Sequence, residues 1–188
     1  LPTPGNLKVY PGLVNPLDGK SPLYQIAGID NIVCDEGISD VGKICAANEK
    51  LVLALEQLAP ELKQKGWTMT IRQAHRTWDI QYKLWKLSGF DRSRACNPGS
   101  KDNPYLCPHM VAGAIDIAIH DSSGNHIGSV AQEAFMCSHL FVRYGGERWH
   151  FEMGTKKWDK AEQARANEKC CYYGVSLPTD TGGQTCSI

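Results

Sequence analysis

An aspartate inside an apolar strand constrains this chain more than any other feature of its sequence. Residues 112–119 read Ala-Gly-Ala-Ile-Asp-Ile-Ala-Ile. This run is rich in β-branched side chains and too short for a typical helix, so we expect a strand. Alternation then puts the isoleucines on the face toward the core and Asp116 on the opposite face, among alanines that leave room for an ion and a substrate. A carboxylate in such a strand has to be paired or bound to a metal to offset its desolvation.

Two histidines and a glutamate lie where they could join Asp116 in one site. His109 precedes the strand on the loop that enters it, and His150 lies in a second expected strand at 148–153. Glu147 has the opposite parity to His150, so it can face the same site only from the turn before that strand. Two imidazoles and a carboxylate are ligands suited to zinc, and a nearby glutamate could take the proton of a metal-bound water. Each of these residues alone would more often be a surface or hydrogen-bonded residue or part of an ordinary charge pair, and only the combination favours a metal site.

The same residues resemble two motifs of a known family. The motifs are Ser-x-His-x-x-Gly-x-Ala-x-Asp and Glu-x-Trp-His of the zinc D-Ala-D-Ala dipeptidases and carboxypeptidases, which belong to the wider superfamily of lysostaphin, D-Ala-D-Ala metallopeptidases and the hedgehog signalling domain. Both motifs occur here in the right order and with matching spacing. The matching residues are His109, Ala114, Asp116, Glu147, Trp149 and His150. The resemblance implies that His109, Asp116 and His150 bind one zinc ion and that Glu147 is catalytic.

A third segment extends the resemblance toward the N-terminus. Arg76, preceded by His75 and followed by Gln81, looks like the family's Tyr-Arg-Ser segment with its downstream glutamine, which lies between a strand and a helix. The resemblance then spans residues 67–153, and it implies that Arg76 stabilises the charge that develops on the scissile carbonyl. Gln81, His75 and Trp149 are candidate substrate-binding residues. A wall or hydrogen-bonding role for His75 is equally consistent with its position.

The chain departs from the family motif at two positions. Cys107 stands where the family has a serine that contributes to substrate contacts, and Ala112 stands where it has a glycine, with Gly113 displaced by one residue. The expected metal ligands are all in place. The departures therefore concern the substrate pocket.

Eight cysteines in 188 residues predict disulfide bonds. Their positions are 34, 45, 96, 107, 137, 170, 171 and 186. No Cys-x-x-Cys pair occurs, so we do not expect a zinc site made of cysteines, and disulfides indicate an oxidising compartment. A bridge between Cys96 and Cys107 would close the polar, turn-rich loop between them and fix the approach to His109. The alternative for Cys107 is a free thiol that serves as a fourth metal ligand.

The composition is that of a globular domain without an affinity for polyanions. The chain has 20 basic and 20 acidic residues, so its net charge is zero, and neither nucleic acid nor an anionic membrane is an expected partner. No apolar run is long enough to span a membrane, and no signal peptide pattern opens the chain. We expect a secreted or periplasmic monomer from which any signal peptide has been removed.

The remaining periodicity predicts a single α+β domain over residues 1–188. Helices should pack on one face of a small, mostly antiparallel sheet, with the zinc cleft on the other face. The expected elements are a Pro-rich N-terminal arm or set of turns at 1–36, one or two helices at 40–65 ended by Gly66, a strand at 67–73, a helix at 78–87, a helix at 129–140, strands at 141–144 and 148–153, a surface helix at 158–168 and a disulfide-stapled tail at 170–188.

Together, the residues and the resemblance predict a secreted zinc metallopeptidase. Its substrates would be peptide bonds involving D-amino acids in peptidoglycan stem peptides, cleaved by a D,D-carboxypeptidase or dipeptidase reaction. Two alternatives stay open: a non-catalytic zinc-containing binding module of the hedgehog type, and a cell-wall-degrading endopeptidase toxin or lysin. Glu147 and Arg76 together favour an enzyme, because a binding module has no chemical need for both. Two imidazoles and a carboxylate could also bind a divalent ion other than zinc.

Overall fold

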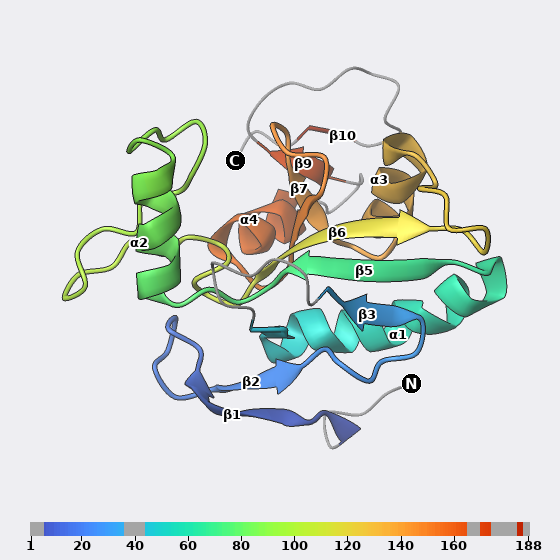
Figure 1. Cartoon of the computed structure of the whole chain (residues 1–188), viewed down its shortest axis with the longest axis horizontal. Coiled ribbons are helices and arrows are strands. Elements are labelled where there is room, and N and C mark those ends of the chain that lie inside the picture. The colour runs from blue at the N-terminus through green and yellow to red at the C-terminus, as the bar shows by residue number, and fades with distance from the viewer. Residues whose placement is uncertain (1–5, 36–43, 165–169, 174–183, 186–188) are drawn as a thin grey trace.

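The computed structural model describes residues 6–35, 44–164, 170–173 and 184–185, with side chains as far as residue 160 (Figure 1). They form an α+β fold with two sheets. The strands are β1 (Val9–Val14), β2 (Pro22–Gln25), β3 (Ile32–Cys34), β4 (Ala46–Ala47), β5 (Thr68–Gln73), β6 (Ala114–His120), β7 (Val142–Tyr144), β8 (His150–Glu152), β9 (Cys170–Tyr173) and β10 (Gln184–Thr185). The helices are α1 (Glu49–Lys65), α2 (Trp78–Leu87), α3 (Ser129–Ser138) and α4 (Lys156–Ala164).

The larger sheet has seven strands in the order β10-β9-β7-β8-β6-β5-β3. Its centre is antiparallel, because β5 pairs with β6, β6 with β8, and β8 with β7 in that sense. Toward its edges, β3 and the pair β9 and β10 join in parallel. The second sheet, made of β1, β2 and β4, is antiparallel. The predicted fold class, helices with a mostly antiparallel sheet, is confirmed.

The isoleucine face of β6 is buried under α1 and α3. Ile115, Ile117 and Ile119 are each at most 1% exposed, and they share one core cluster with apolar side chains of both helices. The helix residues in this cluster include Leu51, Leu55, Leu58, Leu62, Phe135 and Met136. Because side chains alternate along the strand, Asp116 lies on the opposite face, as predicted.

Helix α1 begins later than its periodicity predicts. The apolar pattern predicts one or two helices over residues 40–65. Residues 40–43 lie outside the described residues, residues 46–47 form a strand, and α1 begins after Asn48. The Asn48 side chain accepts a hydrogen bond from the Leu51 amide at 2.8 Å and caps the first turn. Gly66 ends the helix as predicted, with a φ of 66° that glycine adopts without strain.

The Pro-rich N-terminal segment contains three strands, where the sequence predicted an arm or a set of turns. Strands tolerate its prolines because Pro11 lies in the irregular part of β1 and Pro22 begins β2. Leu23 has no exposed surface, so the segment is anchored by burial as well as by pairing. A disulfide between Cys34 and Cys45 ties the end of β3 to the residue before β4.

Helix α2 has the predicted bounds and stands at the end of the sheet where β6 begins (Figure 1). The Thr77 hydroxyl accepts a hydrogen bond from the Ile80 amide at 3.4 Å, which caps the helix. Trp85 is 8% exposed and packs edge-on against Phe90. Since β5 leads into this helix, Arg76 lies between a strand and a helix.

The C-terminal elements lie near their predicted positions. Helix α4 begins two residues before the predicted start, because the Thr155 hydroxyl accepts a hydrogen bond from the Trp158 amide at 3.1 Å. Residues 165–168 of the predicted helix and most of the predicted stapled tail lie outside the described residues, although Cys137 is disulfide-bonded. In the part of the chain that the structure describes, no helix has the length and apolar character needed to cross a membrane.

Candidate active site

Three side chains from separate segments meet on the face of the sheet opposite the isoleucines. Asp116 lies on β6, His150 is its partner across the β6–β8 pairing, and His109 comes from the loop before β6. His109 Nε2 is 3.1 Å from Asp116 Oδ1 and 3.2 Å from His150 Nδ1. His150 Nδ1 is also 3.1 Å from the same carboxylate oxygen. All three residues are buried, and their ligand atoms are close enough together to hold one metal ion.

The second nitrogen of each imidazole has its own partner. His109 Nδ1 is 2.7 Å from the carbonyl oxygen of Ala74, and His150 Nε2 is 3.0 Å from Glu152 Oε1. A carbonyl and a carboxylate accept hydrogen bonds, so each ring donates one N–H there and turns its other nitrogen toward Asp116. Glu152 is itself fully buried and held by the Thr155 hydroxyl, which donates to it at 2.7 Å. The rings are therefore oriented as ligands through Nε2 of His109 and Nδ1 of His150.

The charges in this cluster favour a cation. Burial lowers the pKa of His109 to about 4, and the Arg76 guanidinium acts in the same direction. Burial opposes protonation of His150, but hydrogen bonds to Asp116 and Glu152 raise its pKa to about 10. Burial alone would raise the pKa of Asp116, yet the two histidines hold it well below its usual range. At neutral pH His109 is thus neutral, and His150 is protonated between the carboxylates of Asp116 and Glu152.

Glu147 lies at the edge of the cluster, on the turn between β7 and β8, as predicted. Its Oε2 is 3.6 Å from His150 Nδ1, and its side chain is 35% exposed. Burial raises the pKa of Glu147, Asp116 adds to this effect, and His150 opposes it. The turn is closed by a hydrogen bond from the Glu147 amide to the Tyr144 carbonyl at 3.1 Å. A carboxylate with a raised pKa, placed between the cluster and solvent, can accept and return a proton.

Arg76 reaches the cluster from the segment between β5 and α2. Its Nη2 donates to Asp116 Oδ2 at 3.3 Å, while Nε and Nη1 donate to the side-chain oxygens of Gln73 at 3.2 Å and Gln81 at 3.3 Å. Burial lowers the pKa of Arg76, and the carboxylates of Asp116 and Glu147 oppose this shift. A guanidinium held by three acceptors beside the cluster can stabilise negative charge on a substrate oxygen.

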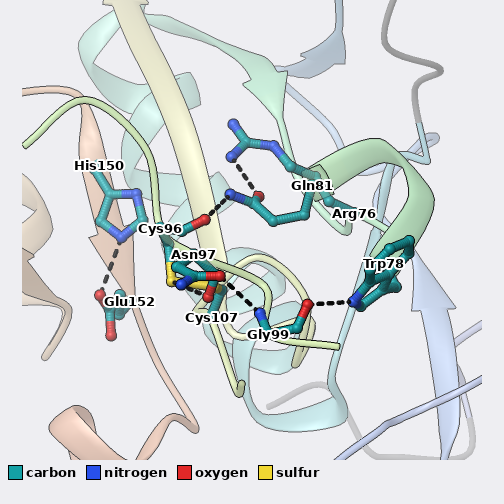
Figure 2. The surroundings of a disulfide bond; sticks show 9 residues. All are labelled: Arg76, Trp78, Gln81, Cys96, Asn97, Gly99, Cys107, His150 and Glu152. Carbon is teal, nitrogen blue, oxygen red and sulfur yellow. Dashed lines mark hydrogen bonds and ion pairs between the residues drawn. A yellow bond between two sulfur atoms is a disulfide. The ribbon is translucent and has the colours of Figure 1, made fainter. Parts of the chain in front are cut away.

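The three predicted substrate-binding residues lie at different depths. Trp149 is 48% exposed and lines the cavity next to the cluster. Gln81 lines the same cavity but is 2% exposed, and its amide contacts the Arg76 guanidinium (Figure 2). His75 is 4% exposed, and its Nδ1 lies 3.2 Å from the carbonyl oxygen of His109. These positions favour contact with substrate for Trp149, and a role in holding other site residues for Gln81 and His75.

A cavity of about 990 Å³ opens beside the cluster. Its walls include parts of α2, segments 92–97 and 105–108, and residues of the turn at 144–149. The volume is at the upper end of the range of about 300–1,000 Å³ that is usual for ligand pockets, so several residues of a peptide can enter. The exposed apolar side chains along it are Leu87, Tyr105, Leu106 and Trp149.

The structure shows the surroundings of the two positions at which the sequence departs from the motif, Cys107 and Ala112. Cys107 forms the predicted disulfide with Cys96, so it is not a free thiol ligand. Ala112 has a φ of 54°, in the left-handed region that favours glycine. Gly113 has no room for a side chain, because a Cβ there would lie 2.5 Å from Thr155 Cγ2. Strand β6 therefore begins after this turn, two residues later than predicted.

Comparison with known proteins gives a likeness in structure alone. No family model matches the sequence, and no curated protein matches it. A solved structure of the LdcB LD-carboxypeptidase, described as revealing the molecular basis of peptidoglycan recognition, matches 84% of this chain and 79% of its own with a TM-score of 0.50 and 18% sequence identity. The two chains share a fold. The His-Asp-His cluster of this protein is thus built on a fold that also occurs in LdcB.

Two supports of the site were missed from the sequence. Glu152 lies two residues after His150 on the same strand, and the alternation of β8 is a signal that could have placed both on one face. Arg148 donates to the buried Glu133 of α3 at 2.7 Å and 3.3 Å. This ion pair anchors the turn that carries Glu147. No local pattern marks a contact between residues so far apart in the sequence.

Proposed function

We propose that the protein is a zinc-dependent peptidase that hydrolyses peptide bonds involving D-amino acids in peptidoglycan stem peptides. The observation that carries this proposal is the cluster of His109, Asp116 and His150, in which one nitrogen of each imidazole is turned toward the same carboxylate oxygen. Glu147 stands next to that point with its carboxylate 3.6 Å from His150. An arrangement of three ligands and an adjacent carboxylate is the one that hydrolytic zinc sites use.

The donor set fits zinc. Two imidazole nitrogens and one carboxylate oxygen are common ligands of catalytic zinc, and three protein ligands leave a position for water. Glu152 and the Ala74 carbonyl supply the outer contacts that metal-binding histidines usually make. When bound, zinc would lower the pKa of a water molecule toward about 7 and polarise the substrate carbonyl. A different divalent ion remains compatible with the same donors.

The chain's own groups would move the protons and stabilise the developing charge. Glu147 would take the proton of the attacking water at its carboxylate and pass it to the leaving amine, a role that its raised pKa favours. Arg76 would donate hydrogen bonds to the oxygen of the scissile carbonyl as that oxygen gains charge. Asp116 contacts the Arg76 guanidinium and both histidines. It therefore fixes the distance between the guanidinium and the proposed metal ligands.

The substrate class is supported by the likeness to LdcB and by the shape of the site. LdcB is described as an LD-carboxypeptidase whose structure reveals peptidoglycan recognition. The cavity beside the cluster is large enough for several residues of a stem peptide, and Trp149 at its edge would contact them. Gln81 and His75 would act indirectly, by holding Arg76 and the His109 loop.

The proposed site of action is outside the cytoplasm. The disulfides Cys34–Cys45 and Cys96–Cys107 support an oxidising compartment, since cytosolic proteins rarely keep such bonds. Peptidoglycan is also reached in that compartment. The proposal also includes that the protein is secreted and monomeric.

A panel of stem peptides tests the proposed activity. The zinc-loaded protein is incubated with a tetrapeptide stem, a pentapeptide stem, a D-Ala-D-Ala dipeptide and a cross-linked pair of stems, and the products are identified by mass spectrometry. Release of a terminal D-Ala supports a carboxypeptidase, splitting of the dipeptide supports a dipeptidase, and cutting of the cross-link supports the endopeptidase alternative. An intact panel, together with a full equivalent of bound zinc, would contradict an enzyme and favour the hedgehog-like binding module.

A further inference from the structure

Figure 2 shows the disulfide between Cys96 and Cys107. Both residues line the cavity beside the cluster. Cys107 is 2% exposed and lies two residues before His109. Cys96 lies in the segment that follows α2 and faces the same cavity. The bond therefore joins the two cavity walls that come from opposite ends of the loop 97–106.

A chain of hydrogen bonds leads from this disulfide to the guanidinium of Arg76. The carbonyl oxygen of Cys96 accepts a hydrogen bond from Gln81 Nε2 at 2.8 Å. Gln81 Oε1 accepts one from Arg76 Nη1 at 3.3 Å, and Arg76 Nη2 donates to Asp116 at 3.3 Å. Figure 2 shows the first two of these contacts side by side, with Gln81 between Cys96 and Arg76.

The Cys96 carbonyl decides which way the Gln81 amide points. The amide has an NH₂ group at one end and an oxygen at the other, and only the oxygen can accept from a guanidinium. A carbonyl on the far side of the amide can pair only with the NH₂ group, so it turns the oxygen toward Arg76. Because Gln81 is 2% exposed, water does not readily replace a lost partner.

The backbone next to Cys96 is also held by the turn before it, in which the Ala95 amide donates to the Asp91 carbonyl at 3.0 Å. Among the described residues, the loop 97–106 is attached to α2 by a hydrogen bond from Trp78 Nε1 to the Gly99 carbonyl at 3.3 Å (Figure 2). A second attachment is the ion pair of Lys101 with Asp79, which is largely exposed and contributes little. The disulfide adds a covalent constraint to this part of the wall.

We propose that the Cys96–Cys107 disulfide is a positioning element for Arg76. It fixes the Cys96 carbonyl, the carbonyl orients the Gln81 amide, and the amide oxygen holds the guanidinium against the metal cluster. The catalytic consequence rests on the proposed function, in which Arg76 stabilises the charge on the scissile carbonyl. The effect of the disulfide on the position of Arg76 does not rest on the proposed function, because it concerns only how firmly the side chain is held.

The chain offers a matched control in its other described disulfide. Cys34–Cys45 closes a loop of the same length, with a sequence separation of 11 in both cases. In the chain-entropy view, loss of either bond relaxes the unfolded state by the same amount. Neither Cys34 nor Cys45 lines the cavity in the described structure. A difference in activity between the two disulfide variants therefore does not arise from loop entropy.

The experiment compares Cys96→Ser/Cys107→Ser with Cys34→Ser/Cys45→Ser in the full, zinc-loaded protein, well below the unfolding midpoint of each. We expect similar losses of thermal stability from both. Only the first variant should lose kcat on a stem peptide, by about 10- to 100-fold, the range for a lost hydrogen bond to a charged group, with KM within about twofold. The NMR signal of the Arg76 Nε–H, assigned by its absence in Arg76→Lys, should shift or broaden in that variant alone.

A rescue variant separates positioning from general damage. Glu at position 81 presents two equivalent oxygens, so Gln81→Glu needs no carbonyl to orient it toward Arg76. Added to Cys96→Ser/Cys107→Ser, it should recover part of the lost kcat and sharpen the Arg76 signal. Equal losses of kcat in both disulfide variants, or an Arg76 signal that does not change when Cys96–Cys107 is removed, would overturn the proposal. If the wild-type protein cleaves no peptide, the proposed function fails, and the NMR signal still decides the positional claim.

Discussion

The sharpest consequence of the cluster's electrostatics is that metal binding displaces one proton. At pH 6 the pKa of about 4 leaves His109 neutral, and the pKa of about 10 leaves His150 protonated. Asp116 is ionised, because its pKa lies well below its usual range. A metal ion can take the Nδ1 lone pair of His150 only after that nitrogen loses its proton. Zinc binding at pH 6 should therefore release one proton from the ligand set.

The proton on His150 also sets how the affinity for zinc depends on pH. Between pH 5 and pH 7 the apparent association constant for zinc should rise about tenfold per pH unit, because one proton competes with the ion throughout this interval. Calorimetric titrations at pH 6 in buffers with different ionisation enthalpies give the number of protons from the slope of the observed enthalpy. At this pH a zinc-bound water with a pKa of about 7 keeps most of its protons and contributes little.

Glu147→Gln is the control for this count. If the proton leaves from His150, the variant releases the same number as the wild-type protein; a lower number would assign the proton to Glu147. Two results would refute the assignment of the proton to His150. One is the release of almost no protons on zinc binding, and the other is a zinc affinity that does not change between pH 5 and pH 7.

Three further changes test the catalytic and structural parts of the account. Glu147→Gln should keep a full equivalent of zinc yet lower turnover by about 10²- to 10⁴-fold, and near-normal activity would remove Glu147 from the mechanism. Glu133→Gln should lower the free energy of unfolding by about 3–5 kcal/mol, measured in urea, because it removes the buried negative charge that pairs with Arg143 and Arg148. Gly113→Ala should destabilise the fold by about 1–3 kcal/mol, since its Cβ would lie 2.5 Å from a Thr155 methyl; an unchanged unfolding curve would contradict this close packing.

The cluster of His109, Asp116 and His150 was predictable because its signals are local. Asp116 interrupts an apolar strand, and the alternation of that strand assigns it to the face away from the isoleucines. Helix α2 was predicted with its observed bounds for a similar reason, since the Thr77 cap and the apolar periodicity coincide. In these segments the local preference and the tertiary structure agree.

Other features depend on contacts between distant segments. Residues 44–47 are all apolar and lie within the stretch predicted as helix, yet strand β4 pairs with β2 and α1 begins only after the Asn48 cap. The strands of the N-terminal segment likewise exist because of pairing with partners elsewhere in the chain. Propensity is a weak guide where such pairing decides the conformation.

The buried contacts around the site were the hardest to foresee. The approach of Arg148 to Glu133 requires α3 to pack beside the β7–β8 turn, which no sequence pattern states. The Cys96–Cys107 bond was an expectation from the turn-rich loop between the two residues, and its link to Arg76 through Gln81 emerges only from the folded geometry.

Metal-dependent cleavage of a peptidoglycan stem peptide is the most direct test of the central claim. The purified, oxidised protein is stripped with a chelator, divided, and assayed by mass spectrometry without metal and after one equivalent of zinc is restored. The account predicts no product without metal, product after restoration, and a full equivalent of bound zinc but greatly reduced product in Glu147→Gln. Cleavage that persists in the chelator-treated sample, or no cleavage by a protein that holds one zinc ion, would contradict it.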